Sequence, residues 1–351
     1  MLLLRRPYAF RAALAVLAAT TVSCHLGIAK RVDYSVRPMA LVPLGDKVVD
    51  RSAAFAERFC AVLPHTDGGP WDPCGTYLDA QVPTPAPFDS PIQSPLKVMI
   101  VGGAFSECFT QSGIEIYGPS IDHIRTHGVV FGPPVKIGGT ATPEANAEEI
   151  EKYLAANGGD YLAIGHSKGA VDLMTAIVLQ PLAKQQIKPL VSVTGAIGGT
   201  RLADLGAAIG IIGFCSALRK AGIDCEIKDE GGIASLRRDL RYRALRAWNP
   251  PATLRSFSLA AVSRLEKTST PLHTMWKTNA IYSIDQDSHI IAEEAVIPGS
   301  EFLGVANGDH WAVALPMSMF PKVNWNRFPR TALLEAIIRH VAAPSDGNGR
   351  E

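Results

Sequence analysis

The sequence lacks an excess of charge of either sign. Its 351 residues carry 34 Lys and Arg against 33 Asp and Glu, which leaves a formal net charge of +1. Because no overall positive field attracts polyanions, nucleic acid is not an expected partner. Residues 237–246 form one basic cluster, which Asp239 partly offsets, and we interpret this cluster as a solvated helix face. Its arginines are Arg237, Arg238, Arg241, Arg243 and Arg246.

Cysteine pairs of the C-x-x-C type are also missing, which argues against a structural zinc site. Beyond Cys24, five cysteines remain, an odd number. In an oxidising compartment we expect Cys60 to pair with Cys74 and Cys215 with Cys225, because each pair is close in sequence. This pairing leaves Cys108 free, although spacing alone does not determine connectivity.

Long apolar runs that would cross a membrane are absent as well. Residues 202–218 are almost wholly apolar, but Asp204 and several glycines interrupt them. The apolar run at 12–19 is too short for a span and follows two arginines, so we expect residues 1–24 to be an export signal. Its end also resembles a lipoprotein signal, Thr21-Val22-Ser23-Cys24, in which Cys24 would be acylated. The expected localisation is periplasmic, outer-membrane lipoprotein or secreted, with membrane association only through a lipidated Cys24.

The remaining chain divides into an extension, a large domain and a tail. Residues 25–92 are an expected N-terminal extension, with a helix at 48–63 and then a loop rich in proline and glycine. Residues 93–342 form the expected domain, with a cap insertion at about 201–255. A buried packing helix is the alternative interpretation of the apolar part of that insertion. Residues 343–351 are polar, and we expect them to be disordered.

Strands and helices alternate through the large domain, which predicts an α/β fold with a mainly parallel sheet and helices on both faces. No internal repeat is apparent. The expected strands are 95–103, 129–136, 161–164, 187–193, 279–284 and 301–305, and residues 256–262 are a further apolar segment. The expected helices are 121–126, 145–156, 168–179 and 331–342.

A G-x-S-x-G pattern joins the strand at 161–164 to the helix that starts at Lys168. Such a sharp turn from strand to helix holds its central residue in a strained conformation and requires small neighbours. Ser167 would then stand at the exposed tip as a nucleophile. The backbone N–H of Lys168 opens the helix and is one candidate oxyanion donor. The bend after the strand at 95–103 supplies the other, from Ala104 or Phe105.

A serine hydroxyl needs an adjacent base, and His310 is the candidate. It follows the last expected strand, and the chain order of serine, acid and histidine is the one typical of this fold. The other histidines come too early, lie beside the nucleophile, sit in loops before the last strand or fall within the last helix. They are His25, His65, His123, His127, His166, His273, His289 and His340.

The acid must hold the imidazole in one tautomer. Asp309 is adjacent to His310 in sequence and is badly placed to bond its ring. Asp287 lies in the loop that precedes 290–297, and we favour it. Asp285 is the alternative, because loop register cannot be read from one sequence.

These residues carry a resemblance that extends over about residues 97–341. The matching motifs are Val101-Gly102-Gly103, Gly165-His166-Ser167-Lys168-Gly169, Gly198-Gly199-Thr200 and Asp309-His310-Trp311. With them the chain resembles the α/β-hydrolases, and more narrowly the secreted bacterial lipases and esterases. Lys168 stands where such lipases often carry glutamine or methionine. Arg201 follows Gly199-Thr200, where they carry a Gly-Thr-Pro-His turn.

The resemblance implies an exported serine hydrolase that cleaves carboxylic esters, lipid-like or acyl, through a Ser-His-Asp triad. It implies no redox cofactor, and no local acidic loop demands the structural calcium of some lipases. The expected partner is a small-molecule or lipid ester. Two alternatives stay open: an acyltransferase on the same fold, and a non-catalytic cell-surface binding protein on a hydrolase scaffold.

Overall fold

A computed structural model describes residues 47–66, 69–78, 88, 91–92, 94–206, 215–216, 218–219, 222–223, 231–316 and 328–343. All of them lie in one compact unit, 38–351. The expected export signal with Cys24, parts of the cap insertion, Cys225 and the tail from 344 lie outside these ranges.

The described residues form a six-stranded sheet in which every neighbouring pair is parallel, as predicted. The strand order is β1-β6-β5-β4-β3-β2. The inner strands are apolar and almost fully buried, as expected for a parallel sheet covered on both faces. The strands are β1 (Val49–Asp50), β2 (Lys97–Val101), β3 (Tyr161–His166), β4 (Ile187–Val193), β5 (Arg255–Val262) and β6 (Glu301–Asn307).

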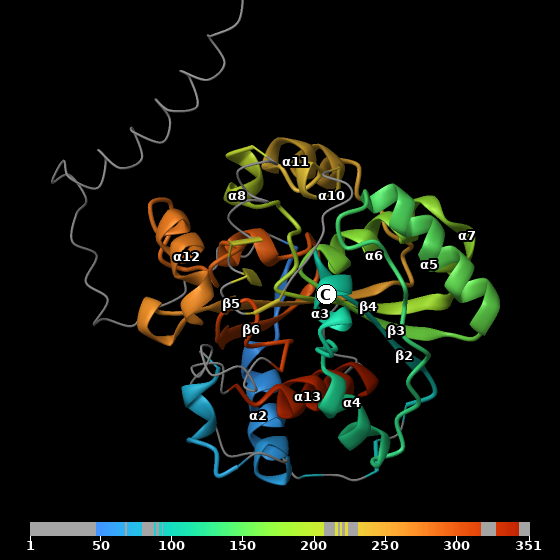
Figure 1. Cartoon of the computed structure of the whole chain (residues 1–351). Helices are drawn as coiled ribbons and strands as arrows, with labels where there is room; N and C mark the ends of the chain where they lie inside the picture. The colour runs from blue at the N-terminus through green and yellow to red at the C-terminus, as the bar shows by residue number, and fades with distance from the viewer. Residues whose placement is uncertain are drawn as a thin grey trace, which may run out of the picture. The chain divides into compact units, whose positions relative to one another are not determined.

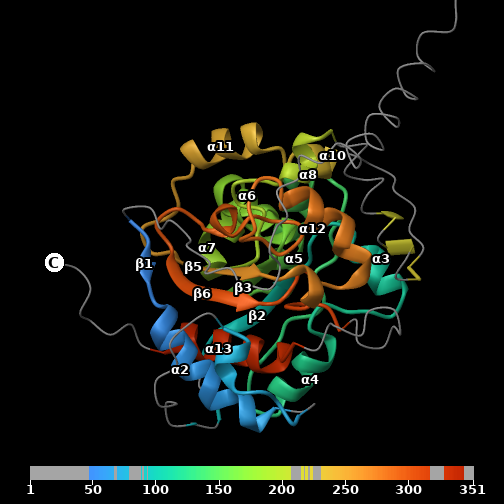
Figure 2. The same cartoon turned by 90° about the vertical axis from the view of Figure 1, so that its left-hand side faces the viewer.

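Helices cover both faces of this sheet (Figure 2). One face carries α5 (Pro143–Asn157), α6 (Lys168–Leu179) and α7 (Pro181–Gln186). The opposite face carries α2 (Ser52–Val62), α4 (Gly118–Arg125) and α13 (Arg330–Ala342). Each face has its own apolar core, so the sheet is buried from both sides.

Further helices near the carboxyl ends of the strands are α3 (Ser106–Gln111), α8 (Arg201–Asp204), α10 (Gly231–Ala234) and α12 (His273–Asn279) (Figures 1 and 2). Helix α11 (Arg238–Arg246) lies over the face that carries α6, where Leu245 packs on the core of that face (Figure 2). Short 3-10 segments are Leu63–His65, Cys74–Thr76, Leu265–Lys267, Thr270–Leu272 and Ala292–Ala295. The helices α8, α10 and α11 belong to the expected cap insertion.

Two predicted strands are wrong. Residues 129–136 contribute only an isolated bridge between Phe131 and Val98, because Pro133 and Pro134 remove backbone donors that a strand needs. Residues 279–284 are the end of α12 and the turns that follow it. The extension is also more than a surface cover, since β1 extends the sheet and α2 is part of the core.

One of the two expected disulfides is present and the other is wrong. Cys60 and Cys74 are bonded, with an S–S distance of 2.13 Å. Cys215 is a free, partly buried thiol, whereas Cys108 is disulfide-bonded. The reversal arises because the fold, not proximity in sequence, determines which sulfurs meet. Within the described ranges, no helix combines the length and apolar character that a membrane crossing requires.

Candidate active site

Ser167 stands at the corner between β3 and α6. Its backbone angles are φ 55° and ψ −125°, a region that non-glycine residues rarely occupy and that costs on the order of 1–3 kcal/mol. The close approach of Gly103 helps to hold this corner, since a Cβ on Gly103 would lie 2.7 Å from Ser167 Cβ. The G-x-S-x-G turn therefore has the strained geometry that its sequence predicts.

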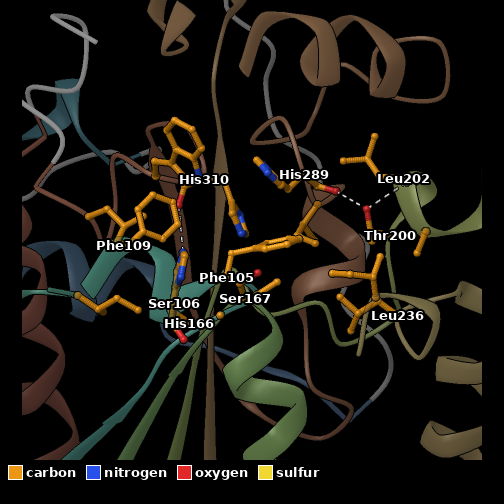
Figure 3. A pocket seen from close by; sticks show the side chains of 18 residues that line it. Phe105, Ser106, Phe109, His166, Ser167, Thr200, Leu202, Leu236, His289 and His310 are labelled. Atoms are coloured by element: carbon orange, nitrogen blue, oxygen red, sulfur yellow. Dashed lines mark hydrogen bonds between the residues drawn. The ribbon is translucent and has the colours of Figure 1, made fainter. Parts of the chain in front are cut away.

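His310 lies in the loop after β6 and is bonded to Asp287. Its Nδ1 is 2.7 Å from Asp287 Oδ2, and its backbone N–H donates to the Asp287 carbonyl at 2.8 Å. Both side chains are almost fully buried. With Nδ1 engaged, Nε2 is the ring nitrogen left to face the pocket, where the His310 ring is directed toward Ser167 (Figure 3).

Asp287 is the acid that the structure brings to His310, and Asp285 is not. The second oxygen of Asp287 accepts the backbone N–H groups of His289 at 2.9 Å and Ile290 at 2.8 Å. Asp285 is only half-buried, and its backbone carbonyl accepts from Ala292. Asp309 turns away from the His310 ring and caps Trp311 and neighbouring residues through its own carboxylate.

Three buried histidines lie together beside Ser167. The His289 ring stacks on His310 with centroids 4.4 Å apart and planes 23° apart, and the His166 ring lies 4.7 Å from His310. His166 Nε2 is 3.0 Å from the His310 carbonyl. Burial lowers the pKa of all three imidazoles and, for Asp287, raises the pKa to about 6. His310 is therefore neutral near pH 7, as a general base must be.

Of the expected oxyanion donors, Ala104 and Phe105 line the same pocket, and Lys168 directly follows the lining residue Ser167. The Lys168 N–H is at the first turn of α6, where backbone donors have no partner within the helix. Ala104 directly follows Gly103, which touches Ser167. Gly139 packs close to the Phe105 nitrogen, since a Cβ on Gly139 would lie 2.5 Å from it. Ala104 and Phe105 both stay candidates for the second donor.

The side chain of Lys168 does not reach the pocket. It is fully buried and bonds both carboxylate oxygens of Asp172, one turn along α6, at 2.8 and 2.9 Å. Asn146 of α5 donates to Asp172 Oδ2 at 2.8 Å and to the Gly138 carbonyl at 2.9 Å. Lys168, which stands where lipases often carry glutamine or methionine, therefore belongs to a buried polar network that ties the first turn of α6 to α5.

The pocket above Ser167 is lined mainly by apolar side chains (Figure 3). One part comes from the strand-end loops and α3, and another from the cap insertion. The apolar lining residues are Ala104, Phe105, Phe109, Ile116, Leu202, Ala203, Ile233, Leu236, Ile290, Trp311 and Leu315. Such a lining favours an apolar ligand group over a charged one.

Sequence reasoning missed His289 and the supporting role of His166. We expected His289 to be an ordinary loop residue, and no local pattern marks its stack on His310. Its position two residues after Asp287 was the available signal, because a loop that aims Asp287 at His310 also carries its neighbours there. Its carbonyl accepts the Thr200 hydroxyl at 2.6 Å, which links this loop to the cap insertion.

Two side-chain groups of the described residues have ligand atoms close enough to share a metal ion. One is Asp287, His289 and His310, where both Asp287 oxygens already accept hydrogen bonds. The other is His123, His127 and Glu335, which lies between α4 and α13.

Comparison with known proteins gives structural relatives only. No protein-family model matches the chain, and no curated protein matches it in sequence. Among solved structures, the metagenomic carboxyl esterase MGS0156 matches with 29% identity and a TM-score of 0.72, over 88% of this chain and 97% of that one.

Two further structures share the fold at low identity. Lipase 1 from Pelosinus fermentans has 9% identity and a TM-score of 0.53, over 72% of this chain and 100% of that one. Staphylococcus hyicus lipase has 12% identity and a TM-score of 0.51, over 72% and 97%. This chain is an α/β-hydrolase of the lipase and esterase-like kind. Its neighbours support an ester hydrolase.

Proposed function

We propose that this protein is an exported serine hydrolase that cleaves carboxylic esters with an apolar acyl group. The observation that carries the proposal is the buried Asp287–His310 pair, bonded at 2.7 Å and directed toward a strained Ser167. The structural likeness to a carboxyl esterase supports the same reaction class. The apolar acyl group in this proposal is inferred from the apolar lining of the pocket.

In the proposed mechanism, Ser167 Oγ attacks the ester carbonyl while His310 Nε2 takes its proton. The oxyanion that forms is held by the N–H groups of Lys168 and of Ala104 or Phe105. His310 then donates the proton to the leaving alcohol, and an acyl-enzyme remains on Ser167. Water attacks this intermediate, again with His310 as the base, and releases the carboxylic acid. Asp287 keeps the imidazole in the tautomer that accepts on Nε2.

The pocket supports an apolar acyl chain as the preferred substrate part. Its polar groups cluster at Ser167 and the histidines, whereas the cap insertion contributes Leu202, Ile233 and Leu236. An acyl chain would bury against these side chains, and each methylene group buried stabilises binding by about 0.8 kcal/mol.

The test is hydrolysis of p-nitrophenyl esters of increasing acyl length by the wild type, Ser167→Ala and the exposed control Ser112→Ala. We expect Ser167→Ala to lose roughly 10⁴-fold or more in kcat, and the control to keep its activity. A fluorophosphonate should label Ser167 and no other serine, as located by peptide mass mapping. Full activity in Ser167→Ala would refute the mechanism, and product analysis with added alcohol would reveal an acyltransferase.

Export and anchoring are proposed from the pattern in residues 1–24 alone. Expression in a bacterial host, followed by cell fractionation, would test export. Radiolabelled palmitate should be incorporated into the wild type but not into Cys24→Ser if Cys24 is acylated. A protein that stays in the cytoplasm with its leader intact would contradict this part of the proposal.

A further inference from the structure

A second cluster of titratable side chains lies away from the pocket. It is between α4 and α13, on the face of the sheet opposite to α5, α6 and α7 (Figures 1 and 2). His123 is on α4, and His127 follows four residues later in the turn after this helix. Glu335 is on α13. His123 Nε2 is 3.6 Å from Glu335 Oε2, and His127 Nδ1 is 3.0 Å from Glu335 Oε1.

We propose that His123, His127 and Glu335 form a binding site for a divalent transition-metal ion, Zn²⁺ being the best match. One nitrogen from each imidazole and one carboxylate oxygen lie within 4.8 Å of one another. Zinc bonds of about 2.0–2.2 Å in tetrahedral geometry place neighbouring ligand atoms about 3.3–3.5 Å apart, near the 3.6 Å between His123 Nε2 and Glu335 Oε2. Two imidazoles also favour zinc over magnesium or calcium, which prefer oxygen ligands.

Glu335 provides the second observation that points to a ligand. Its side chain is fully buried, and its Oε2 has no hydrogen-bond partner although it faces His123. A buried carboxylate oxygen without a hydrogen bond is costly, and a metal ion would satisfy it.

Arg339 does not fill the place that the ion would take. Its Nε donates to Glu335 Oε1 at 2.8 Å, and its Nη2 lies 2.8 Å from the same oxygen, which is also 3.0 Å from His127 Nδ1. The other oxygen, Oε2, faces His123. A carboxylate that binds a metal through one oxygen is commonly held by a hydrogen bond to the other. Arg339 itself lies over the Phe88 ring at 4.7 Å, and this contact fixes the guanidinium.

Access and ring orientation also fit an ion. The side chains of His123 and His127 are 15% and 18% exposed, so an ion could enter from solvent and keep a water as its fourth ligand. The two rings are 4.9 Å apart and nearly perpendicular, so they approach a shared point from different directions. The ion would tie α4 to α13 and stabilise the folded chain without contacting Ser167.

The experiment is a calorimetric titration of Zn²⁺ into the full-length protein after removal of metal with a chelator. We expect one ion per chain, and binding roughly a hundredfold weaker or more in His123→Gln and His127→Gln. His65→Gln is the matched control, because His65 stacks on Phe88 at 4.0 Å but lies outside the ligand set. Circular dichroism and ester hydrolysis establish that each variant is folded.

Two further readouts separate this site from the catalytic group. Zn²⁺ should raise the melting temperature of the wild type and of His310→Asn, but not of His127→Gln. Co²⁺ should give the intense visible absorption of a tetrahedral site in the same proteins. The absence of wild-type binding, or binding that survives both His123→Gln and His127→Gln, would overturn the proposal. Binding lost in His310→Asn instead would place the ion on the catalytic histidines and would also overturn it.

Discussion

The two sides of the pocket are held in different ways. The strand-end side consists of the loops that carry residues 103–105, 166–167, 287–290 and 309–311. The cap side consists of residues 200–203 and 233–236 from the insertion. On the strand-end side, nearly every polar group is buried and bonded, whereas the cap side presents apolar side chains and a few polar anchors.

The strand-end side also concentrates backbone strain. Phe105, Ser167 and Ser288 all have positive φ without being glycine, with values of 62°, 55° and 91°. Such conformations persist only where surrounding contacts over-determine them. Here Asp287 accepts hydrogen bonds from the backbone N–H groups of two residues, His289 and Ile290, and is bonded to His310 Nδ1. Together with the contact of His166 Nε2 with the His310 carbonyl, these bonds provide that constraint.

The cap side is joined to the body mainly through α11. Arg238 Nε bonds Glu294 at 2.7 Å, and Tyr242 donates to the other Glu294 oxygen at 2.8 Å. Arg241 is buried and donates to the Ile197 carbonyl at 3.2 Å. These anchors lie behind the pocket and leave its cap wall apolar. Under the proposed function, we expect the strand-end side to set the chemistry and the cap side to set which acyl chain fits.

The largest effect on activity is expected when Asp287, the acid on the strand-end side of the pocket, is replaced. Asp287→Asn should lower kcat by about 10⁴-fold, because the amide favours the wrong His310 tautomer while the fold is kept. Asp285→Asn is the matched control and should stay within about tenfold of the wild type. Steady-state ester hydrolysis measures both. A larger loss in Asp285→Asn than in Asp287→Asn would assign the acid to the other residue.

The next effect concerns the buried pair beneath the nucleophile. Lys168→Ala leaves Asp172 buried without its cation, and we expect the free energy of unfolding to fall by about 3–5 kcal/mol. Lys152→Ala removes an exposed pair with Glu149 of the same 2.8 Å length, and it should leave the free energy of unfolding almost unchanged because solvent screens that pair. Urea unfolding measures both.

A double variant checks the cause of that loss. Lys168→Met with Asp172→Leu removes both charges, so it should recover most of the stability that Lys168→Ala loses. If the double variant is no more stable than Lys168→Ala, the loss comes from packing in α6 and not from an uncompensated charge.

A smaller effect on kcat/KM is expected from a change on the cap side of the pocket. Leu236→Ala opens the apolar wall, and we expect kcat/KM for a long-chain ester to fall about tenfold while an acetate ester changes little. Leu240→Ala is the control, since Leu240 lies on α11 of the same insertion and is exposed. An equal loss on both esters would mean that the cap supports the catalytic residues and does not select the chain.

The sequence predicts the elements whose signal is local. β4 has the predicted bounds of 187–193, and the turn at Ser167 is recognisable because strand, glycines and helix follow within a few residues. The strand expected at 279–284 fails because its apolar residues are not buried: Ile281 is 78% exposed and Tyr282 is 50% exposed. Apolar content alone could not show that.

Contacts between distant segments were beyond prediction. His289 meets His310 because β5 and β6 end at the same edge of the sheet, and the loop after each strand turns inward. The bonding of Cys108, and the approach of Glu335 to His123 and His127, depend in the same way on helices and loops far apart in the chain. A sequence pattern places each segment but does not give the side of it that meets a partner.

The smallest expected effect is on the acid limb of the pH profile. The active form needs a neutral His310 and an ionised Asp287, so activity falls as pH drops through their titration. Burial lowers the pKa of His310 below 6.5 and raises that of Asp287 to about 6, so we expect kcat/KM to halve near pH 6 with one apparent pKa for the pair.

The same profile compares the two sides of the pocket. His289→Ala admits water beside the His310 ring, which weakens the desolvation of the imidazole and should move the acid limb upward toward pH 6.5. Leu236→Ala should leave the limb where it is, because Leu236 belongs to the cap wall. Profiles of kcat/KM for a short-chain ester from about pH 4 to about pH 9 measure both shifts. If Leu236→Ala moved the limb as far as His289→Ala, the cap would control the solvation of His310, and the division between chemistry and chain selection would not hold.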